Sequence, residues 1–137
     1  MGLLKAEFDE YNNPDTTAID MTGRAPANSP EYQYNVGFDY FFMEAWTFKT
    51  NVEGKGSYYF SNSHNEESDP YALLNSSLEY TNGSLTASMW IRNITDEEYF
   101  VRGFGSFPNN PGDGYTSTRY TQLGAPRTFG LTVSYDF

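Results

Sequence analysis

Apolar and polar residues alternate along most of this sequence, and this period of two constrains the fold more than any other feature. The clearest case is the C-terminal segment RTFGLTVSYDF, residues 127–137, whose apolar positions are Phe129, Leu131, Val133, Tyr135 and Phe137. Successive side chains of a β-strand point to opposite faces of a sheet, so these residues share one face. The segment predicts a strand with one apolar face and one polar face.

Five further segments alternate in the same way, which gives six expected strands and no convincing helix. They are residues 4–8, 31–42, 46–60, 71–80 and 84–93. In at least three segments the alternation continues for about ten residues, whereas strands of soluble proteins have about five or six. Strands that cross an outer membrane need about nine to eleven residues. The lengths favour an all-β, antiparallel up-and-down transmembrane barrel over a soluble sandwich.

Aromatic residues make up 18% of the chain and gather at the two ends of the expected apolar faces. In residues 31–42, Tyr32 and Tyr34 lie at one end of the apolar face and Tyr40 and Phe42 at the other. In residues 46–60, Trp46 and Phe48 lie at one end and Tyr58 and Phe60 at the other. Ten residues at a rise of about 3.3 Å and a tilt of about 40° cover on the order of 25 Å, the height of a barrel's apolar band. Tyr and Trp prefer both borders of that band. The apolar face is therefore expected to contact lipid, and the polar face to surround an aqueous lumen.

The connections between the expected strands are alternately long and short. The gap at residues 43–45 and the Asn-Gly turn at residues 81–84 are short, whereas residues 10–30, 61–70 and 95–123 are long and rich in Asn, Asp, Ser, Pro and Gly. Outer-membrane barrels have short periplasmic turns and long extracellular loops. Residues 4–8 then run outward and the last strand runs inward. Arg127 lies near the outer-leaflet surface, where it either pairs with lipid phosphate or is simply solvated.

Six strands do not close a barrel, because the smallest such barrels have eight strands and an open sheet edge leaves unpaired backbone groups in lipid. The N-terminal residues show no signal peptide. We therefore expect residues 1–137 to form one unit, the C-terminal segment of a larger barrel, and Met1 to be a truncated start rather than a biological one. The alternative is an oligomeric barrel built from six-stranded chains.

Composition excludes several classes of function. The chain has 18 acidic and 8 basic residues and a net charge of −10, so it offers no basic surface to nucleic acid. It has no cysteine and one histidine, His64, which leaves no cluster of metal-binding side chains. Adjacent carboxylates such as those of Glu97 and Glu98 point to opposite faces of an extended chain and form no acid–base pair. We expect neither an enzyme nor a bound cofactor or metal.

Several short motifs, taken in order, resemble the C-terminal end of a TonB-dependent outer-membrane receptor. The segment RNITDEEYFVRGF, residues 92–104, is followed by a Gly/Asn/Pro-rich loop and then by QLGAPRTFGLTVSYDF with its terminal Phe137. Upstream, the ANSP segment at residues 27–30 and the YALLN segment at residues 71–75 are also similar to that family. The resemblance covers essentially the whole chain, and it implies the last six strands of a 22-stranded barrel whose N-terminal plug domain is absent from this chain.

The resemblance also implies a function and partners. It implies energy-coupled uptake of a scarce solute into a Gram-negative bacterium. Among such solutes, a ferric siderophore or a similar chelate is the one we expect. The implied partners are outer-membrane lipid and lipopolysaccharide, the plug domain, the TonB complex and the barrel assembly machinery. The last strand is the implied assembly signal, through Phe129, Leu131, Val133, Tyr135 and Phe137.

Two sets of residues are candidates for contacts with the solute. The first set consists of aromatic and basic residues in or beside the long loops: Tyr59, His64, Phe104, Phe107, Tyr115, Arg119 and Tyr120. Such residues suit capture of the solute, and the alternative is that they pack the loops against one another. If His64 is no ligand, we expect it to be exposed and solvated. Charged residues with lumen parity are expected to form cross-strand ion pairs: Glu7, Asp9, Lys49, Glu53, Lys55, Glu79 and Arg92. Trp90 shares that parity, and packing is expected rather than stacking on a ligand.

Two other classes of function stay open at this point. One is a soluble all-β module that binds carbohydrate through exposed Tyr and Trp. The other is a different outer-membrane barrel with a structural or adhesin role.

Overall fold

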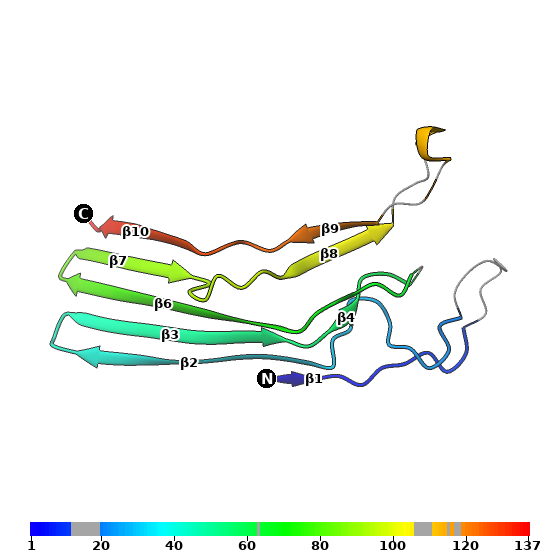
Figure 1. Cartoon of the computed structure of the whole chain (residues 1–137). Helices are drawn as coiled ribbons and strands as arrows, with labels where there is room; N and C mark the ends of the chain where they lie inside the picture. Colours follow the sequence, from blue (N-terminus) through cyan, green and yellow to red (C-terminus); the bar gives the residue numbers. More distant parts are fainter. Residues whose placement is uncertain (12–19, 63, 106–110, 115, 117–118) are drawn as a thin grey trace.

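The computed structural model describes residues 1–11, 20–62, 64–105, 111–114, 116 and 119–137, and its main feature is an open antiparallel sheet of six strands (Figure 1). The strands, in spatial order, are β1 (Gly2–Leu3), β2 (Tyr32–Phe42), β3 (Trp46–Lys55), β6 (Tyr71–Asn82), β7 (Leu85–Arg92) and β10 (Thr128–Tyr135). No helix in the described ranges is long and apolar enough to span a bilayer. The predicted all-β, antiparallel, incomplete barrel is confirmed.

The short turns lie at one end of the sheet and the long connections at the other (Figure 1). Met43, with a φ of 55°, lies in the turn between β2 and β3, and Gly83, with a φ of 58°, lies in the turn between β6 and β7. The long connections contain two small hairpins, β4 (Tyr58–Tyr59) with β5 (Glu67–Ser68) and β8 (Phe100–Gly105) with β9 (Arg119–Leu123), and the 3₁₀ turn η1 (Pro111–Asp113). The predicted alternation of long and short connections is confirmed.

The strand register gives the sheet two chemically different faces. Val36 pairs with Val52 and Val52 with Leu74, while Met89 pairs with Leu131, so apolar residues line up across the sheet. We call this the apolar face and the opposite one the polar face. Phe38, Leu131 and Val133 are about 60% exposed or more, and no second layer of described residues covers them. A water-soluble fold would bury these side chains, so the apolar face needs another environment.

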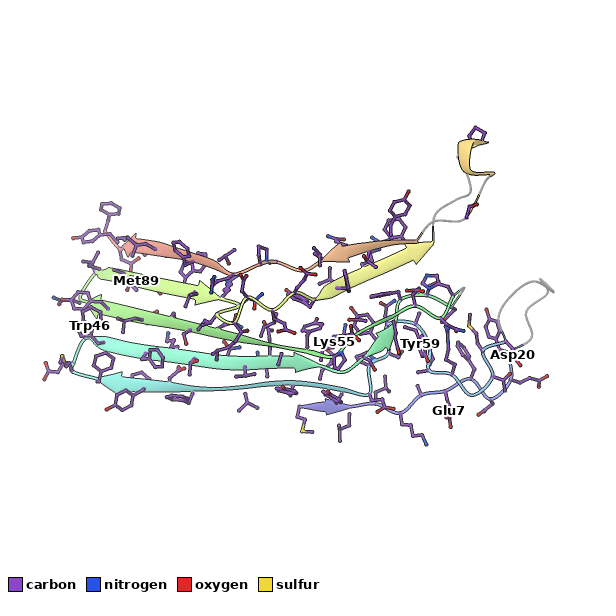
Figure 2. All side chains as sticks on the ribbon, viewed as in Figure 1. Glu7, Asp20, Trp46, Lys55, Tyr59 and Met89 are labelled. Atoms are coloured by element: carbon purple, nitrogen blue, oxygen red, sulfur yellow. The ribbon has the colours of Figure 1, made fainter. Side chains whose placement is uncertain are left out.

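Aromatic rings collect at the turn end of the apolar face. Phe42 stacks on Tyr40 at 5.8 Å and on Trp46 at 6.4 Å, and the Trp46 ring lies 5.0 Å from that of Tyr80. Figure 2 shows Trp46 at this end, away from Tyr59 at the loop end. The predicted aromatic row at the turn end is therefore present in the structure.

Two expected strands end differently from the prediction. Residues 4–8 form no strand, because the Phe8 N–H donates to the Arg24 carbonyl at 3.0 Å and the Gly23 N–H donates to the Phe8 carbonyl at 2.7 Å. These contacts turn the chain into its own loop after the two paired residues of β1. The prediction that Glu7 and Asp9 line the lumen from a strand is therefore wrong.

The third strand stops at Lys55 rather than at Phe60. Tyr58 and Phe60 are buried, 3% and 7% exposed, because the long connections pack around them. Their predicted place in an outer aromatic girdle is therefore wrong. At the loop end of β2 the Tyr32 and Tyr34 rings do stack, at 6.3 Å, on the apolar side of Gly54 and Gly56.

Candidate functional site

One arginine joins the first two long connections. The Arg24 guanidinium donates through Nη1 to the His64 carbonyl at 2.8 Å and to Asn65 Oδ1 at 2.7 Å, and through Nη2 to the Ser61 carbonyl at 2.7 Å. Its Cζ also lies 4.2 Å from the centre of the Tyr59 ring. A half-buried guanidinium with three carbonyl-type acceptors holds both connections in one geometry.

Further hydrogen bonds join the same two connections. The Asn28 N–H donates to the Tyr59 carbonyl at 2.8 Å, and the Ala27 N–H donates to Asn62 Oδ1 at 2.8 Å. Met21, which precedes Arg24, is 1% exposed. These segments, residues 20–31, 56–62 and 64–70, form what we call the loop layer.

His64 belongs to this layer and is 6% exposed. Its Nδ1 accepts the Glu66 N–H at 3.3 Å. The expectation of an exposed, solvated histidine is wrong, since the carbonyl of His64 is held by Arg24 and the ring follows it inward. The described residues contain no group of three or more His, Cys, Asp or Glu side chains that could hold a metal ion.

A hollow of about 380 Å³ opens in the loop layer beside Arg24. Its lining combines a cation, aromatic rings, small side chains and carboxylates: Thr22, Gly23, Arg24, Ala25, Ser29, Glu31, Ser57, Tyr58, Tyr59 and Glu67. Burial raises the pKa of the Tyr58 phenol, so this ring is neutral at physiological pH. Asp20, at the edge of the layer, has its pKa lowered by the Thr22 backbone N–H and then by the Thr22 hydroxyl. The hollow has room for a planar group of small-molecule size beside the Tyr59 ring.

The loop layer also packs against the β8–β9 hairpin. The Tyr58 hydroxyl donates within 3.2 Å of both the Phe100 and Val101 carbonyls, and the Phe60 ring lies where a Cβ on Gly103 would be. The Lys55 ammonium is 3.7 Å from the centre of the Tyr58 ring. The segment of residues 56–62 and 64–70 therefore contacts both the first and the third long connection at the loop end of the sheet.

The structure brings only some of the predicted solute-binding residues together. Tyr59 and His64 both contact Arg24, whereas Phe104 and Tyr120 stack on each other at 5.8 Å in the β8–β9 hairpin. Arg119 pairs with Gly105 in the same hairpin. Phe107 and Tyr115 lie outside the described residues. The sequence analysis did not single out Arg24. The available signal was that Arg24 is the one basic residue in residues 10–30, a segment that also contains acidic residues.

The polar face carries the predicted cross-strand ion pair in one place. The Lys49 ammonium lies 3.2 Å from a Glu79 carboxylate oxygen. Glu53 instead accepts a hydrogen bond from Asn75 Nδ2 at 3.2 Å, and Lys55 contacts the Tyr58 ring. Ion pairing is therefore confirmed for Lys49 and Glu79 only.

Trp90 packs on the polar face of its own sheet. Its ring covers Gly130, where a Cβ would come within 2.4 Å of it, and its Nε1 donates to Thr132 Oγ1 at 3.2 Å. The Arg92 guanidinium lies 5.4 Å from the indole ring. Packing, as expected, accounts for this tryptophan.

A buried turn interrupts the strand between β7 and β8. Asn93 is 3% exposed with a φ of 51°, and its Nδ2 donates to the Glu97 carbonyl at 2.9 Å and to the Ala125 carbonyl at 3.2 Å. Asp96, also at positive φ, accepts the Arg127 N–H at 2.9 Å and lies 3.5 Å from its guanidinium. Arg127 therefore has a partner in its own chain, whereas the sequence predicted either pairing with lipid phosphate or simple solvation.

The comparison with protein families is consistent with this geometry. A family model described as "TonB dependent receptor-like, beta-barrel" matches residues 4–94, well over half of the chain. The matched span runs through β2, β3, β6 and β7 and ends at the buried turn of Asn93. No solved structure matches the chain.

Proposed function

Because this chain belongs to the TonB-dependent receptor-like β-barrel family, we propose that it forms part of the wall and the extracellular mouth through which a ferric siderophore or a similar chelate enters a Gram-negative cell. The family consists of outer-membrane receptors and transporters rather than enzymes, and its full-length members carry a plug domain and interact with TonB. A soluble carbohydrate-binding module is not retained, since this family lies in the outer membrane.

One observation carries the choice of solute. The hollow in the loop layer places the Arg24 guanidinium over the Tyr59 ring, with the neutral Tyr58 beside them. Ferric chelates of the siderophore class are oxygen-rich, many are anionic, and many carry planar aromatic groups. A guanidinium contributes charge and hydrogen bonds to such oxygens, and phenol rings contribute stacking surface.

The other residues predicted to bind solute remain part of this proposal. Tyr59 would act at the hollow, and His64 would act from the same loop layer, outside the lining of the hollow. Phe104, Phe107, Tyr115 and Arg119 would act from the third connection. The proposal divides the work of the whole receptor: this chain contributes capture and wall, whereas the plug domain and the TonB complex provide energy coupling.

The last strand is proposed as the segment that the barrel assembly machinery reads. Its residues Phe129, Leu131, Val133, Tyr135 and Phe137 lie exposed on the apolar face, at the edge of the sheet. An edge strand with free backbone groups and an apolar row can pair with another strand.

The experiment is a binding titration on the complete receptor that carries this chain, purified in detergent. A ferric catecholate, a ferric hydroxamate, haem and cobalamin are compared. We expect one ferric chelate to bind, and Arg24→Gln to weaken it about tenfold, or about 1.4 kcal/mol. Glu44→Gln, which changes an exposed charge in the short turn at the opposite end of the sheet, is the control and is expected to leave the affinity unchanged.

Two other results would change the proposal in different ways. If haem or cobalamin binds and the ferric chelates do not, the transporter stands and the substrate class is wrong. If the chelate binds equally well to the Arg24→Gln receptor, the hollow is not its site.

A further inference from the structure

We propose that the carboxylates of Glu31 and Glu67 give the hollow in the loop layer a preference for ferric chelates that carry a positively charged arm, such as a protonated primary amine. The inference rests on the proposed function and narrows its substrate class. Arg24 and the Tyr59 ring hold the planar, oxygen-rich part of the chelate, and the two carboxylates hold the arm.

Glu67 lies beside the aromatic ring of the hollow. In the antiparallel pair of β4 and β5, Tyr59 is directly opposite Glu67. Side chains of directly opposed residues share a face, with their Cβ atoms about 4.5–5.5 Å apart. The Arg24 guanidinium lies over the same Tyr59 ring, 4.2 Å from its centre. The hollow therefore presents a cation and a carboxylate on either side of one aromatic ring.

Glu31 borders the hollow from the first long connection. It directly precedes β2, and its carbonyl accepts the Leu4 N–H at 2.9 Å, which fixes its backbone. It contributes to the same lining as Glu67. Both residues are exposed, and neither forms an ion pair with a cation of the described ranges. Two carboxylates are therefore available to a solute at this site.

The charge of the lining favours a cationic partner for these carboxylates. The lining contains two carboxylates and one guanidinium, so its net charge is −1. The guanidinium nitrogens Nη1 and Nη2 of Arg24 already donate to three acceptors of the loop layer and do not neutralise Glu31 or Glu67. Solvent screens charges less in a concave site than on an open surface, so an ammonium group gains more here than elsewhere on the loops.

The long connections as a whole carry charge of the same sign. Residues 10–30, 61–70 and 95–123 contain ten acidic and three basic residues, so most of the chain's net charge of −10 belongs to them. A surface with one predominant sign of charge raises the local concentration of ions of the opposite sign. These connections therefore attract a chelate with a cationic arm and repel one that carries several negative charges.

The size of the hollow agrees with entry of an arm. Its volume is about 380 Å³, near the lower end of the range of about 300–1,000 Å³ that ligand pockets cover. A bulky chelate does not fit inside as a whole. We expect the charged arm and one planar group to enter, while the iron centre remains at the opening.

The test compares two ligands that differ in the charge of the arm alone. One is a linear ferric trihydroxamate with a free terminal ammonium group, and the other is the same chelate with that amine acetylated. Both are titrated against the complete receptor in detergent. The natural receptor is expected to bind the ammonium form about fivefold more tightly, as two exposed ion pairs allow.

Three variants locate the source of this preference. Glu31→Gln and Glu67→Gln are each expected to reduce the ratio of the two affinities about twofold, and the double variant is expected to abolish it. Affinity for the acetylated chelate should stay unchanged in all three. Glu7→Gln, which removes an exposed carboxylate outside the lining, is the matched control for the loss of one negative charge.

Salt separates charge from shape. If the preference comes from ion pairs at an accessible site, it should shrink between 50 mM and 500 mM salt, because the Debye length falls from above about 10 Å to below it. A preference that is unchanged by salt would mean that the added acetyl group is excluded by its size, and it would overturn the proposal.

The remaining outcomes distinguish this inference from the proposed function. If the natural receptor binds both chelates equally well, or if the double variant keeps the preference, the carboxylates have no role and the ferric solute still stands. If neither chelate binds but haem or cobalamin does, both the ferric solute and the charged arm are wrong.

Discussion

Arg24 determines how the two first connections are arranged, because its guanidinium holds acceptors from one segment while its backbone belongs to the other. Its three hydrogen bonds reach His64, Asn65 and Ser61. Hydrogen bonds to a charged group contribute about 1.5–3 kcal/mol each when both partners are ordered.

Replacing Arg24 by Gln should therefore loosen the loop layer without unfolding the sheet. We expect proteolytic cleavage within residues 60–66 of the complete receptor to become at least about tenfold faster. A decrease of about 1.4 kcal/mol in the free energy of local opening raises the population of the open, cleavable state tenfold. Lys5→Gln, which removes an exposed cation from the neighbouring segment, is the control. Equal cleavage rates for the two variants would contradict the clamp.

Asp20 gives the loop layer a weak acid dependence. Its pKa is lowered from 3.8 because the carboxylate accepts the Thr22 N–H at 2.9 Å and interacts with the Thr22 hydroxyl. The ionised form stabilises the turn above the unfolded pKa, and this contribution is lost as pH falls through the lower, folded pKa. Hydrogen exchange at the Thr22 amide should accelerate below about pH 4 relative to Asp20→Asn, in which no such dependence is expected.

At the scale of elements, the strands follow from local pattern, whereas the interruptions between them do not. The period of two assigns each side chain of β2, β3, β6, β7 and β10 to its face, because alternation alone fixes the direction of a side chain in a strand. The turn at Asn93 depends on the Ala125 carbonyl 32 positions away, and the inward place of His64 depends on Arg24, 40 positions away. Such long-range acceptors leave no periodic trace in the sequence.

The buried turn at Asn93 should be sensitive to loss of its amide. Asn93→Ala removes two donated hydrogen bonds and the one that Asn93 Oδ1 accepts from the Glu97 N–H, and it places a Cβ at a φ of 51° without a compensating side-chain contact. Each buried group left unpaired costs about 1–3 kcal/mol. We expect the free energy of unfolding to fall by about 3 kcal/mol or more.

Two variants provide the comparison for this turn. Asn93→Gly relieves only the backbone conformation, so it should lose nearly as much as Asn93→Ala if the amide contacts dominate. Asn35→Ala removes a single exposed side-chain contact, with Asn51, and is expected to change stability by less than about 0.5 kcal/mol. Urea unfolding of the receptor in lipid vesicles measures all three.

At the scale of the whole molecule, the sheet is a wall with two different sides and two edges. One side is apolar and exposed, and the other carries the Lys49–Glu79 pair, amide side chains and Trp90. The outer edge of β10 has no partner strand among the described residues, and β1 covers only the Tyr32 and Gln33 positions of β2. Backbone groups cannot remain unpaired in lipid, so both edges require partner strands.

The assignment of the two sides leads to a direct comparison on β10. Leu131 lies on the apolar face and its neighbour Thr132 on the polar face, where it accepts from Trp90. An arginine in the middle of a lipid-facing strand destabilises a barrel by about 2–4 kcal/mol, whereas the lumen tolerates charge. Leu131→Arg should therefore lower the free energy of unfolding in vesicles by about that amount and slow assembly, and Thr132→Arg should cost less than about 1 kcal/mol. If Thr132→Arg were the more damaging of the two, the faces would be reversed, and the lumen and the loop layer would both have to be reassigned.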